Sequence, residues 1–272
     1  MQRARPSDIP LVAGKPGRRA VDALKFALLA ALVAWWMVHS TEGLGYHWQW
    51  FRIQRYFFAV ADGRLVPGPL IQGLAVTFKI TAVSLVLALG FGLTTALMRL
   101  SGSIVARLVA RMYLELIRNT PLLVQLFFIY FVLSPVFDIS AFASAVLALS
   151  LFEGAYASEI FRAGIRSIHR NQWEAAFSLG LGTWGTYRLV ILPQAVRRIL
   201  PPLTSQAISL VKDSALVSTI AIYDLTMQAQ AIVAETYLVF ETWFSVAAVY
   251  LVATLSLSVA AAFMEKRLKI FS

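Results

Sequence analysis

Ionisable side chains interrupt two long apolar stretches of this chain. Lys212, Asp213 and Ser214 stand within SLVKDSALVSTI, and Glu153 and Tyr156 stand within a second apolar stretch. A charge inside an apolar span costs free energy, so such a residue usually serves a function. Glu153 and Tyr156 are three residues apart, which puts both on one face of a helix. Lys212 and Asp213 are adjacent and are expected to reach different neighbours, either as ligands of a bound molecule or as structural pairs between helices.

The residue inventory excludes most enzyme chemistry. The sequence has no cysteine, so disulfides, thiolate metal sites and a cysteine nucleophile are absent. The three histidines are scattered and lack the spacing of metal ligands. The chain also lacks paired catalytic carboxylates, a Ser–His set and a Gly-Lys-Ser/Thr loop that cradles phosphates. We therefore predict a protein that is not an enzyme and that holds no metal or other cofactor itself.

The elements that carry these residues are predicted to be membrane helices. Of the 272 residues, 59% are hydrophobic and 14% are charged, whereas about a quarter of the residues in an ordinary soluble domain are charged. A helix needs about 20 apolar residues to cross a bilayer. The sequence predicts an all-α, polytopic membrane protein of about six transmembrane helices, near Ala23–Ser40, Ile71–Met98, Met112–Ser134, Phe142–Phe161, Leu203–Ile222 and Thr242–Met264.

The basic residues indicate how these helices are oriented. The formal net charge is +10, and 18 of the 24 Lys and Arg residues fall on the side of the predicted membrane that holds the N-terminus. Three arginines fall on the other side, all in the first outer loop, and three basic residues lie within spans. The positive-inside rule then places both termini in the cytoplasm. The positive charge reflects topology, so we expect the lipid bilayer as a partner and no nucleic acid.

Three shorter segments carry local expectations. Pro121, in RNTP, should break or kink a helix partway along its length. Glu159 and Arg162 are three residues apart and are expected to pair on a helix surface. The segment YHWQWFRIQRYFF, between the first two spans, is rich in aromatic residues. It is expected to lie at the outer membrane interface, with docking of an external partner as the alternative.

The segment 174–195, EAAFSLGLGTWGTYRLVILPQA, separates two apolar stretches but cannot itself cross a membrane. A helix this short is marginal alone, so its apolar residues should be buried against something. Glycines 180, 182 and 185 permit a sharp turn, and prolines 193, 201 and 202 are expected to break or start helices before the next span. We expect a small helix that docks into a cytoplasmic partner. Read as one helix over 172–184, it has an apolar stripe of Trp173, Ala176, Phe177, Gly180 and Trp184.

This segment resembles the signature loop of the membrane subunits of binding-protein-dependent ABC importers. That signature is EAA, three residues, Gly, nine residues and then I-x-L-P, and here only Val190 departs from it, standing where Ile is usual. In that family the short helix, called the coupling helix, sits in a groove of the ATP-hydrolysing subunit and transmits its movements. The resemblance implies contact with the ATPase through Trp173, Glu174, Ala175, Ala176, Phe177, Gly180, Leu192 and Pro193.

Further segments are similar to one branch of that family, the polar amino acid permeases of the histidine/glutamine/glutamate type. They are ELIRNTPLLVQLFFIYF, GAYASEIFRAGIRSI, QWEAAFSLG, LPQAVRRILPPL and SLVKDSALVSTI. Five core spans are usual in that branch, so Ala23–Ser40 is expected to be an added N-terminal helix. The implied division is a basic cytoplasmic tail (1–20), the added helix with the outer interfacial segment (21–69), the importer transmembrane domain (70–265) with its cytoplasmic coupling loop (165–202), and a cytoplasmic tail (266–272).

The resemblance also implies a function and partners. It is typical of the permease subunit of an ATP-driven, binding-protein-dependent importer of polar amino acids in the bacterial inner membrane. Two partner ATPase subunits would bind ATP and Mg, an extracytoplasmic amino-acid-binding protein would deliver the substrate, and a second permease, identical or paralogous, would complete the pathway.

An amino acid is a zwitterion, which gives the intramembrane residues expected roles. Lys212 is expected to hold the carboxylate and Asp213 or Glu153 the ammonium group, with Ser214 and Tyr156 along the same pathway. The alternatives are an ABC permease for another small polar solute, and a secondary transporter, which would leave residues 174–193 without a role. The sequence does not specify which amino acid is carried.

Overall fold

The computed structural model describes residues 16–42, 46–61 and 63–269, and the chain divides into two compact units, residues 1–48 and 49–272. The first unit contains the helix α1 (Pro16–Glu42), which covers the whole of the predicted span Ala23–Ser40. Its described side chains are exposed. Residues 1–15 and 270–272, which make up much of the two predicted cytoplasmic tails, lie outside the described residues.

The second unit begins with an amphipathic helix and a β-hairpin. Ile53 in the helix is buried while Phe51 is 75% exposed. The helix is tied to the rest of the unit, because the backbone N–H of Gln49 donates a hydrogen bond to the Glu241 carboxylate (2.6 Å). The aromatic segment predicted to lie at the membrane interface therefore packs on the unit by one face and leads into a hairpin that the sequence analysis did not predict. These elements are α2 (Trp50–Phe57), β1 (Phe58–Ala61) and β2 (Arg64–Pro67).

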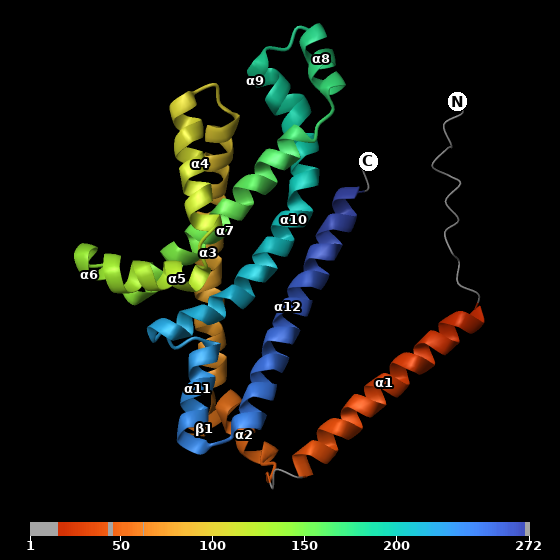
Figure 1. The fold of residues 1–272 in the computed structure, drawn as a ribbon, viewed down its shortest axis with the longest axis vertical. Coiled ribbons are helices and arrows are strands. Elements are labelled where there is room, and N and C mark those ends of the chain that lie inside the picture. Colours follow the sequence, from red (N-terminus) through yellow and green to blue (C-terminus); the bar gives the residue numbers. More distant parts are fainter. Residues whose placement is uncertain (1–15, 43–45, 62, 270–272) are drawn as a thin grey trace. The chain divides into compact units, whose positions relative to one another are not determined.

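Five spans follow if each bent pair of helices is counted as one. Three helices are long and apolar enough to cross a membrane, namely α3 (Pro69–Leu100), α7 (Ala141–Arg166) and α12 (Val239–Lys269) (Figure 1). Two further pairs qualify but are bent, by 105° after α4 (Ile104–Arg118) and by 49° before α11 (Leu225–Thr236). The described residues therefore form an all-α unit with up to five spans, the number expected for the core. α1 is not one of these five, so its passage across the membrane stays a prediction.

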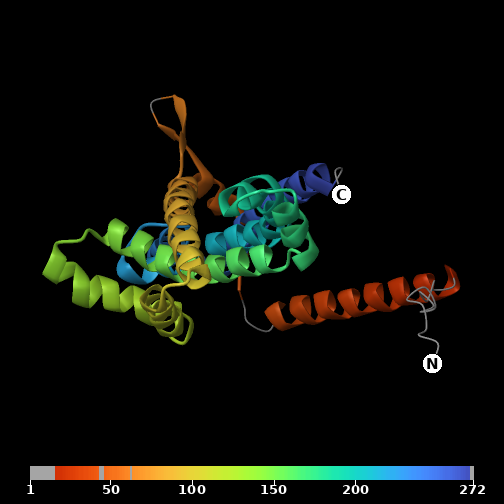
Figure 2. The same ribbon diagram turned by 90° about the horizontal axis from the view of Figure 1, so that it is seen from above.

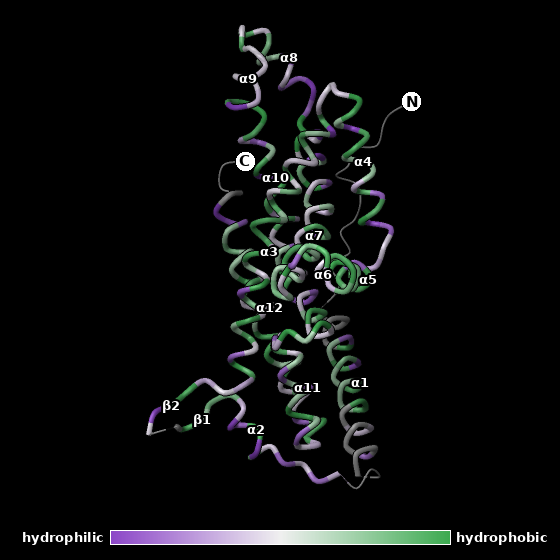
Figure 3. Tube along the Cα trace, turned by 90° about the vertical axis from the view of Figure 1, so that its left-hand side faces the viewer, coloured by the Kyte–Doolittle hydropathy of each residue, from purple (hydrophilic) through white to green (hydrophobic). Residues whose placement is uncertain are grey.

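The contact between α3 and α7 forms the centre of the second unit. A Cβ atom built at Gly92 would lie 2.7 Å from the Cβ of Ala157, so the two helices approach closely at this point. The Ser150 hydroxyl donates to the Ser84 carbonyl oxygen across the same contact (3.3 Å). Small residues and interhelical hydrogen bonds are the usual means of association between helices in a membrane. Hydropathy follows this arrangement, with mostly hydrophobic residues along the spans and hydrophilic residues in α2 (Figure 3).

Pro121 breaks the span that begins with α4, as predicted. A proline has no N–H, so it leaves the carbonyl oxygen of Ile117, four residues earlier, without its helical partner. The Gln125 side chain supplies the missing donor, since its Nε2 donates to the carbonyl oxygens of Ile117 (2.7 Å) and Thr120 (3.0 Å). After the break the chain runs sideways from the bundle (yellow-green in Figure 2). This arm consists of α5 (Leu122–Phe127), the π-helix η2 (Phe128–Leu133) and α6 (Ser134–Phe137).

Two of the three prolines in the span that contains residues 192–213 do not break or start a helix, although the sequence predicts that they do. Pro193 does lie in the first turn of a helix, α10 (Leu192–Asp213), but α10 continues through Pro201 and Pro202 without a break. Packing on α7 holds the helix in this region. A Cβ atom at Gly164 would lie 2.1 Å from Ile199 Cγ1, so the Ile199 side chain occupies the space that this glycine leaves free.

The span that contains α10 changes its helix type next to its two charged residues and bends further on. α10 ends at Asp213 and a 3₁₀ helix, η4 (Ser214–Ile220), follows. Ala221 then adopts a left-handed conformation (φ 57°). Asp224 starts the next helix, α11, because its Oδ1 accepts a hydrogen bond from the backbone N–H of Met227 (2.9 Å). The α-helix therefore ends at Asp213 and not at the upstream prolines, and the span bends after Ile220, between η4 and α11.

Candidate functional site

The intramembrane candidates gather where α7 passes the end of α10. Glu153 is only 2% exposed, and its Oε2 accepts a hydrogen bond from Gln206 Nε2 of α10 (2.5 Å). The Asp213 carboxyl group faces the same glutamate. The other oxygen, Glu153 Oε1, has no hydrogen-bond donor among the described residues. The structure thus brings two of the predicted acids together into an acidic pair with one free acceptor.

The other three candidates lie apart from this acidic pair. Lys212 is exposed, so its side chain reaches different surroundings from Asp213, as expected for adjacent residues. Ser214 is fully buried and donates to the Val211 carbonyl oxygen (2.8 Å), which is a helix-capping contact. Tyr156 contacts Arg118, whose Cζ lies 5.7 Å from the ring centroid. Tyr156 and Glu153 are three residues apart on α7, and their side chains contact different helices.

The backbone around the acidic pair is irregular in the middle of the unit. Val217 and Ile220 of η4 belong to the same buried cluster as Ile80, which lies within the central part of α3. Backbone that leaves the helical pattern at membrane depth occurs where it is buried in protein or lines a water-filled cavity. A charged break in a span, with acceptors for an ammonium group beside it, is the arrangement from which transporters build substrate sites.

The loop predicted to dock a partner forms two short helices instead of one. They are α8 (Arg170–Ser178) and α9 (Thr183–Thr186), and the prediction of one helix over 172–184 is wrong. The chain turns at Gly180, whose φ of +79° favours glycine over any other residue. The turn is closed by a hydrogen bond from the Gly180 N–H to the Phe177 carbonyl oxygen (2.9 Å). The turn residue interrupts the helical stripe, so the periodicity did not extend to Trp184.

The apolar stripe of this loop divides into an inner and an outer part. Ala176 is 2% exposed, and Trp173 packs edge-on against Tyr187 at 5.0 Å between ring centroids. These two residues hold α8 against its own chain. Phe177, Leu179 and Trp184 are 49%, 81% and 73% exposed, so they form the apolar surface that the loop presents. The sequence analysis did not identify Leu179, because it lies outside the helical stripe.

The remaining loop residues lie on the surface or at a helix start. Glu174 forms an ion pair with Arg170 (2.8 Å) on the exposed face of α8. Ala175 is exposed beside it, and Leu192 and Pro193 begin α10 with exposed side chains. The loop lies at the opposite end of the bundle from α2 and the end of α11 (Figure 1). An exposed apolar patch at the tip of a membrane protein is a docking surface in the usual case.

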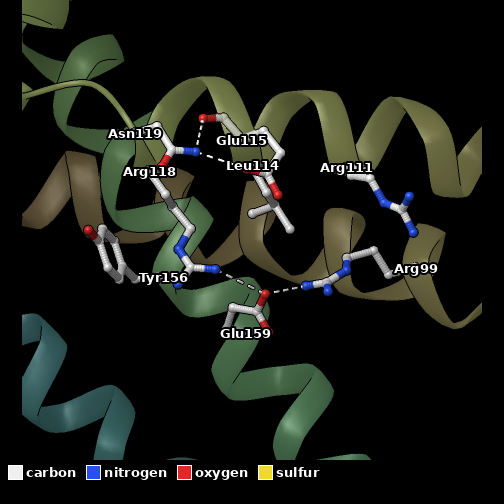
Figure 4. Close-up of a pocket in the computed structure, with 8 residues that line it drawn as sticks. All are labelled: Arg99, Arg111, Leu114, Glu115, Arg118, Asn119, Tyr156 and Glu159. Atoms are coloured by element: carbon white, nitrogen blue, oxygen red, sulfur yellow. Dashed lines mark hydrogen bonds and ion pairs between the residues drawn. The ribbon is translucent and has the colours of Figure 1, made fainter.

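A polar cluster that spacing alone did not reveal surrounds Glu159. The predicted pair with Arg162 is confirmed (2.8 Å), and the same carboxylate also binds Arg99 of α3 (2.5 Å) and Arg118 of α4 (3.2 Å). Figure 4 shows Glu159, Arg99 and Arg118 around a cavity between α3, α4 and α7. Arg99 and Arg118 are 60 and 41 residues from Glu159 in sequence, so no local pattern connects them.

Comparisons with known proteins give a consistent result. Residues 88–270 match the family described as "Binding-protein-dependent transport system inner membrane component". The chain is 42% identical to the glutamine transport system permease protein GlnP of Escherichia coli (strain K12) over 204 residues, which cover 74% of this chain and 93% of GlnP. It is 42% identical to the L-cystine transport system permease protein TcyB of Bacillus subtilis (strain 168) over 185 residues, 67% of this chain and 75% of TcyB.

Solved structures show the same similarity. An amino acid ABC transporter crystallised with histidines matches with a TM-score of 0.70 and 42% identity, over 73% of this chain and 94% of that chain. The MetNI methionine ABC transporter, in an inward-facing conformation, matches with a TM-score of 0.64 and 18% identity, over 74% of this chain and 96% of that chain. The second comparison bears on the fold only.

Proposed function

Because this chain belongs to the family of binding-protein-dependent transport system inner membrane components, we propose that it forms half of the path by which a polar amino acid enters the cell. Members are multi-pass permease subunits of ABC importers, and a separate subunit hydrolyses ATP. Relatives named for glutamine and cystine, at 42% identity each, support an amino acid as the substrate.

The acidic pair and Lys212 are the proposed contacts with that substrate. Glu153 and Asp213 supply acceptors for the ammonium group, and Glu153 Oε1 has no donor of its own among the described residues. Lys212, exposed one residue away, supplies the cation for the carboxylate. Ser214 caps the end of α10, and Tyr156 contacts Arg118 of α4. Tyr156 remains a proposed residue along the same pathway.

The proposed assembly has two permease subunits, two ATPase subunits and an extracytoplasmic binding protein. Both chain termini lie in the cytoplasm in this proposal, with residues 165–202 on the same side and the hairpin outside. The division into an added N-terminal segment (21–69), an importer domain (70–265) and short tails (1–20 and 266–272) is part of the same proposal. The binding protein that copurifies with the assembly would identify the amino acid through its own ligand.

The observation that carries the coupling role is the exposure of Phe177, Leu179 and Trp184 on a loop held against its own chain by the half-buried Trp173 and the buried Ala176. In this proposal Glu174 and Ala175 border the patch, Gly180 forms its turn, and Leu192 and Pro193 anchor the loop to α10. In this proposal the ATPase subunit covers the patch, because the three large apolar side chains would otherwise stay exposed to water.

The test uses single cysteines, which the cysteine-free chain makes selective. Phe177→Cys should form a crosslink to the ATPase subunit, because its side chain is 49% exposed, whereas Ala176→Cys, at 2% exposure, is the matched negative control. Crosslinked bands would be identified by mass spectrometry in membranes that contain the assembled transporter. If Phe177→Cys and Leu179→Cys both fail to reach the ATPase while transport is intact, the loop is not the coupling element.

A further inference from the structure

The cavity beside Glu159 has the composition of an anion site. It has a volume of about 340 Å³ and lies between α3, α4 and α7 (Figure 4). Its wall includes three arginines from two helices and two glutamates. The lining residues are Arg99, Arg111, Leu114, Glu115, Arg118, Asn119, Tyr156 and Glu159.

Positive charge exceeds negative charge at this cavity. The Glu159 carboxylate is shared by Arg99, Arg118 and Arg162, the last of which approaches from outside the cavity wall. The second carboxylate, Glu115, accepts a hydrogen bond from Asn119 Nδ2 (2.9 Å) and is turned towards that end of the cavity (Figure 4). Four guanidinium groups thus stand against two carboxylates.

Arg111 is the residue that makes this surplus available. It forms no ion pair with any described residue, although its neighbours Arg99 and Arg118 both do. Its guanidinium group lies at the same end of the cavity as that of Arg99 (Figure 4). Arg111 and Arg118 are seven residues apart on α4, or about two helical turns, which places both on the cavity side. Two like charges facing one space are stabilised by an anion between them.

The position of the cavity indicates what kind of anion this is. Arg99 is the last residue but one of α3, at the end of the bundle that also holds α8 (Figure 1). Met112 and Leu116, on α4 beside the cavity residues, are 63% and 67% exposed. A basic pocket flanked by exposed apolar side chains at the cytoplasmic level of a membrane protein suits a phosphate head group with its acyl chains on the apolar surface. Guanidinium groups also bind phosphate oxygens in a bidentate geometry.

We propose that this cavity binds a phosphate group, held by Arg111 with Arg99 and Arg118. The phosphate comes from an anionic phospholipid or from a soluble phosphate. The site rests on the proposed orientation only for its assignment to the inner leaflet, since binding itself can be measured without reference to orientation. Nothing in the transport path proposed above uses this cavity, apart from Tyr156 on its wall.

The test compares two arginines on one helix. Arg111→Gln removes the unpaired guanidinium group, and Arg107→Gln removes an exposed arginine one turn away that does not line the cavity. The full chain, copurified with its ATPase subunits in detergent, is titrated with phosphatidylglycerol, with phosphatidylcholine as the neutral control, and separately with inorganic phosphate. Native mass spectrometry counts the bound molecules. Arg111→Gln is expected to weaken binding of the anionic probe about tenfold, and Arg107→Gln to leave it unchanged.

Each outcome decides the matter. Loss of phosphatidylglycerol in Arg111→Gln alone supports the site and identifies a lipid phosphate, and the same pattern with inorganic phosphate identifies a soluble one. Equal binding by the wild type and both variants would overturn the proposal, as would equal loss in both variants, which would indicate a diffuse basic surface. Binding of neither probe by the wild type also overturns it. Thermal unfolding of each variant shows whether any loss reflects misfolding, and uptake assays test the transport role separately.

Discussion

Lys212 and Asp213 are the last two residues of α10, and their side chains lie in different surroundings. α10 ends between them and η4, so the lysine side chain is exposed while the aspartate faces Glu153. A cation and an acidic pair therefore lie within a short distance along the chain. An amino acid carries its ammonium and carboxylate groups on one carbon atom, so the proposed site requires Lys212 and the acidic pair to reach one common space.

Replacing Lys212 by methionine tests this arrangement at the level of one residue. Methionine keeps the length of the side chain but removes its charge, so the contact with a substrate carboxylate is lost. A hydrogen bond to a charged group contributes about 1.5–3 kcal/mol, and Lys212→Met should therefore raise the KM for uptake about ten- to hundredfold. The measurement is uptake of labelled amino acid by proteoliposomes that contain the whole transporter.

Lys79 offers the matched control for that substitution. It is a second lysine within a predicted span of the importer domain, and its ammonium group lies 5.2 Å from the centre of the Phe142 ring of α7. Lys79→Met should leave the KM close to that of the wild type. If Lys212→Met transports as well as Lys79→Met does, then Lys212 is a structural charge and the substrate assignment fails.

At the scale of elements, the sequence predicted effects between neighbouring residues more successfully than contacts between different helices. Pro121 ends α4 because it lacks one N–H, and Arg162 meets Glu159 because three residues make less than one helical turn. Both consequences follow from nearest neighbours in the sequence. The partners of Glu159 on α3 and α4 depend on how the helices cross, so the sequence alone did not reveal Arg99 or Arg118.

In the coupling loop, too, the sequence pattern did not reveal a feature that depends on the folded backbone. The apolar spacing predicted one helix, but the positive φ of Gly180 ends α8 and re-aims the chain into α9. The motif therefore marked the correct segment and the correct glycine, while the reason for that glycine became clear only from the backbone. Likewise, α10 continues through Pro201 and Pro202 next to the packing of Ile199 against Gly164, and no local propensity encodes that contact.

Two glycines of the loop provide a test of this account. Gly180 has a φ of +79°, and Gly182 has a φ of −68°, while no atom would lie within 4 Å of a Cβ at either position. Alanine at Gly180 adopts the left-handed conformation at a cost of about 1–2 kcal/mol, whereas alanine at Gly182 meets no such strain. Gly180→Ala should lower both the thermal stability of the loop and substrate-stimulated ATP hydrolysis, and Gly182→Ala should lower neither.

Limited proteolysis of the loop and ATPase assays on the assembled transporter measure these effects. Because the space at both positions is open, a difference between the variants reports backbone conformation and not crowding. Equal behaviour of Gly180→Ala and Gly182→Ala would contradict the role of the turn.

At the scale of the second unit, the two ends of the bundle differ in chemistry. The loop that contains α8 and α9 lies at one end, and α2 and the end of α11 lie at the other (Figure 1). The first end carries Arg166, Arg170, Arg188, Arg197 and Arg198 in the segment around the loop. Basic residues of short segments stay on the cytoplasmic side during insertion. The ends of the bundle should therefore lie on opposite sides of the membrane, with α8 inside.

Cysteine accessibility in intact cells tests this orientation. The positions chosen are exposed and avoid left-handed backbone: Arg64 in the hairpin, Glu235 near the end of α11 and Thr183 at the start of α9. Because the natural chain has no cysteine, each single-cysteine variant gives one labelling signal. Arg64→Cys and Glu235→Cys should react with a membrane-impermeant maleimide added outside, and Thr183→Cys should react only after the membrane is made permeable. Labelling of Thr183→Cys in intact cells, with Arg64→Cys protected, would invert the topology and place the loop where no ATP-hydrolysing subunit can reach it.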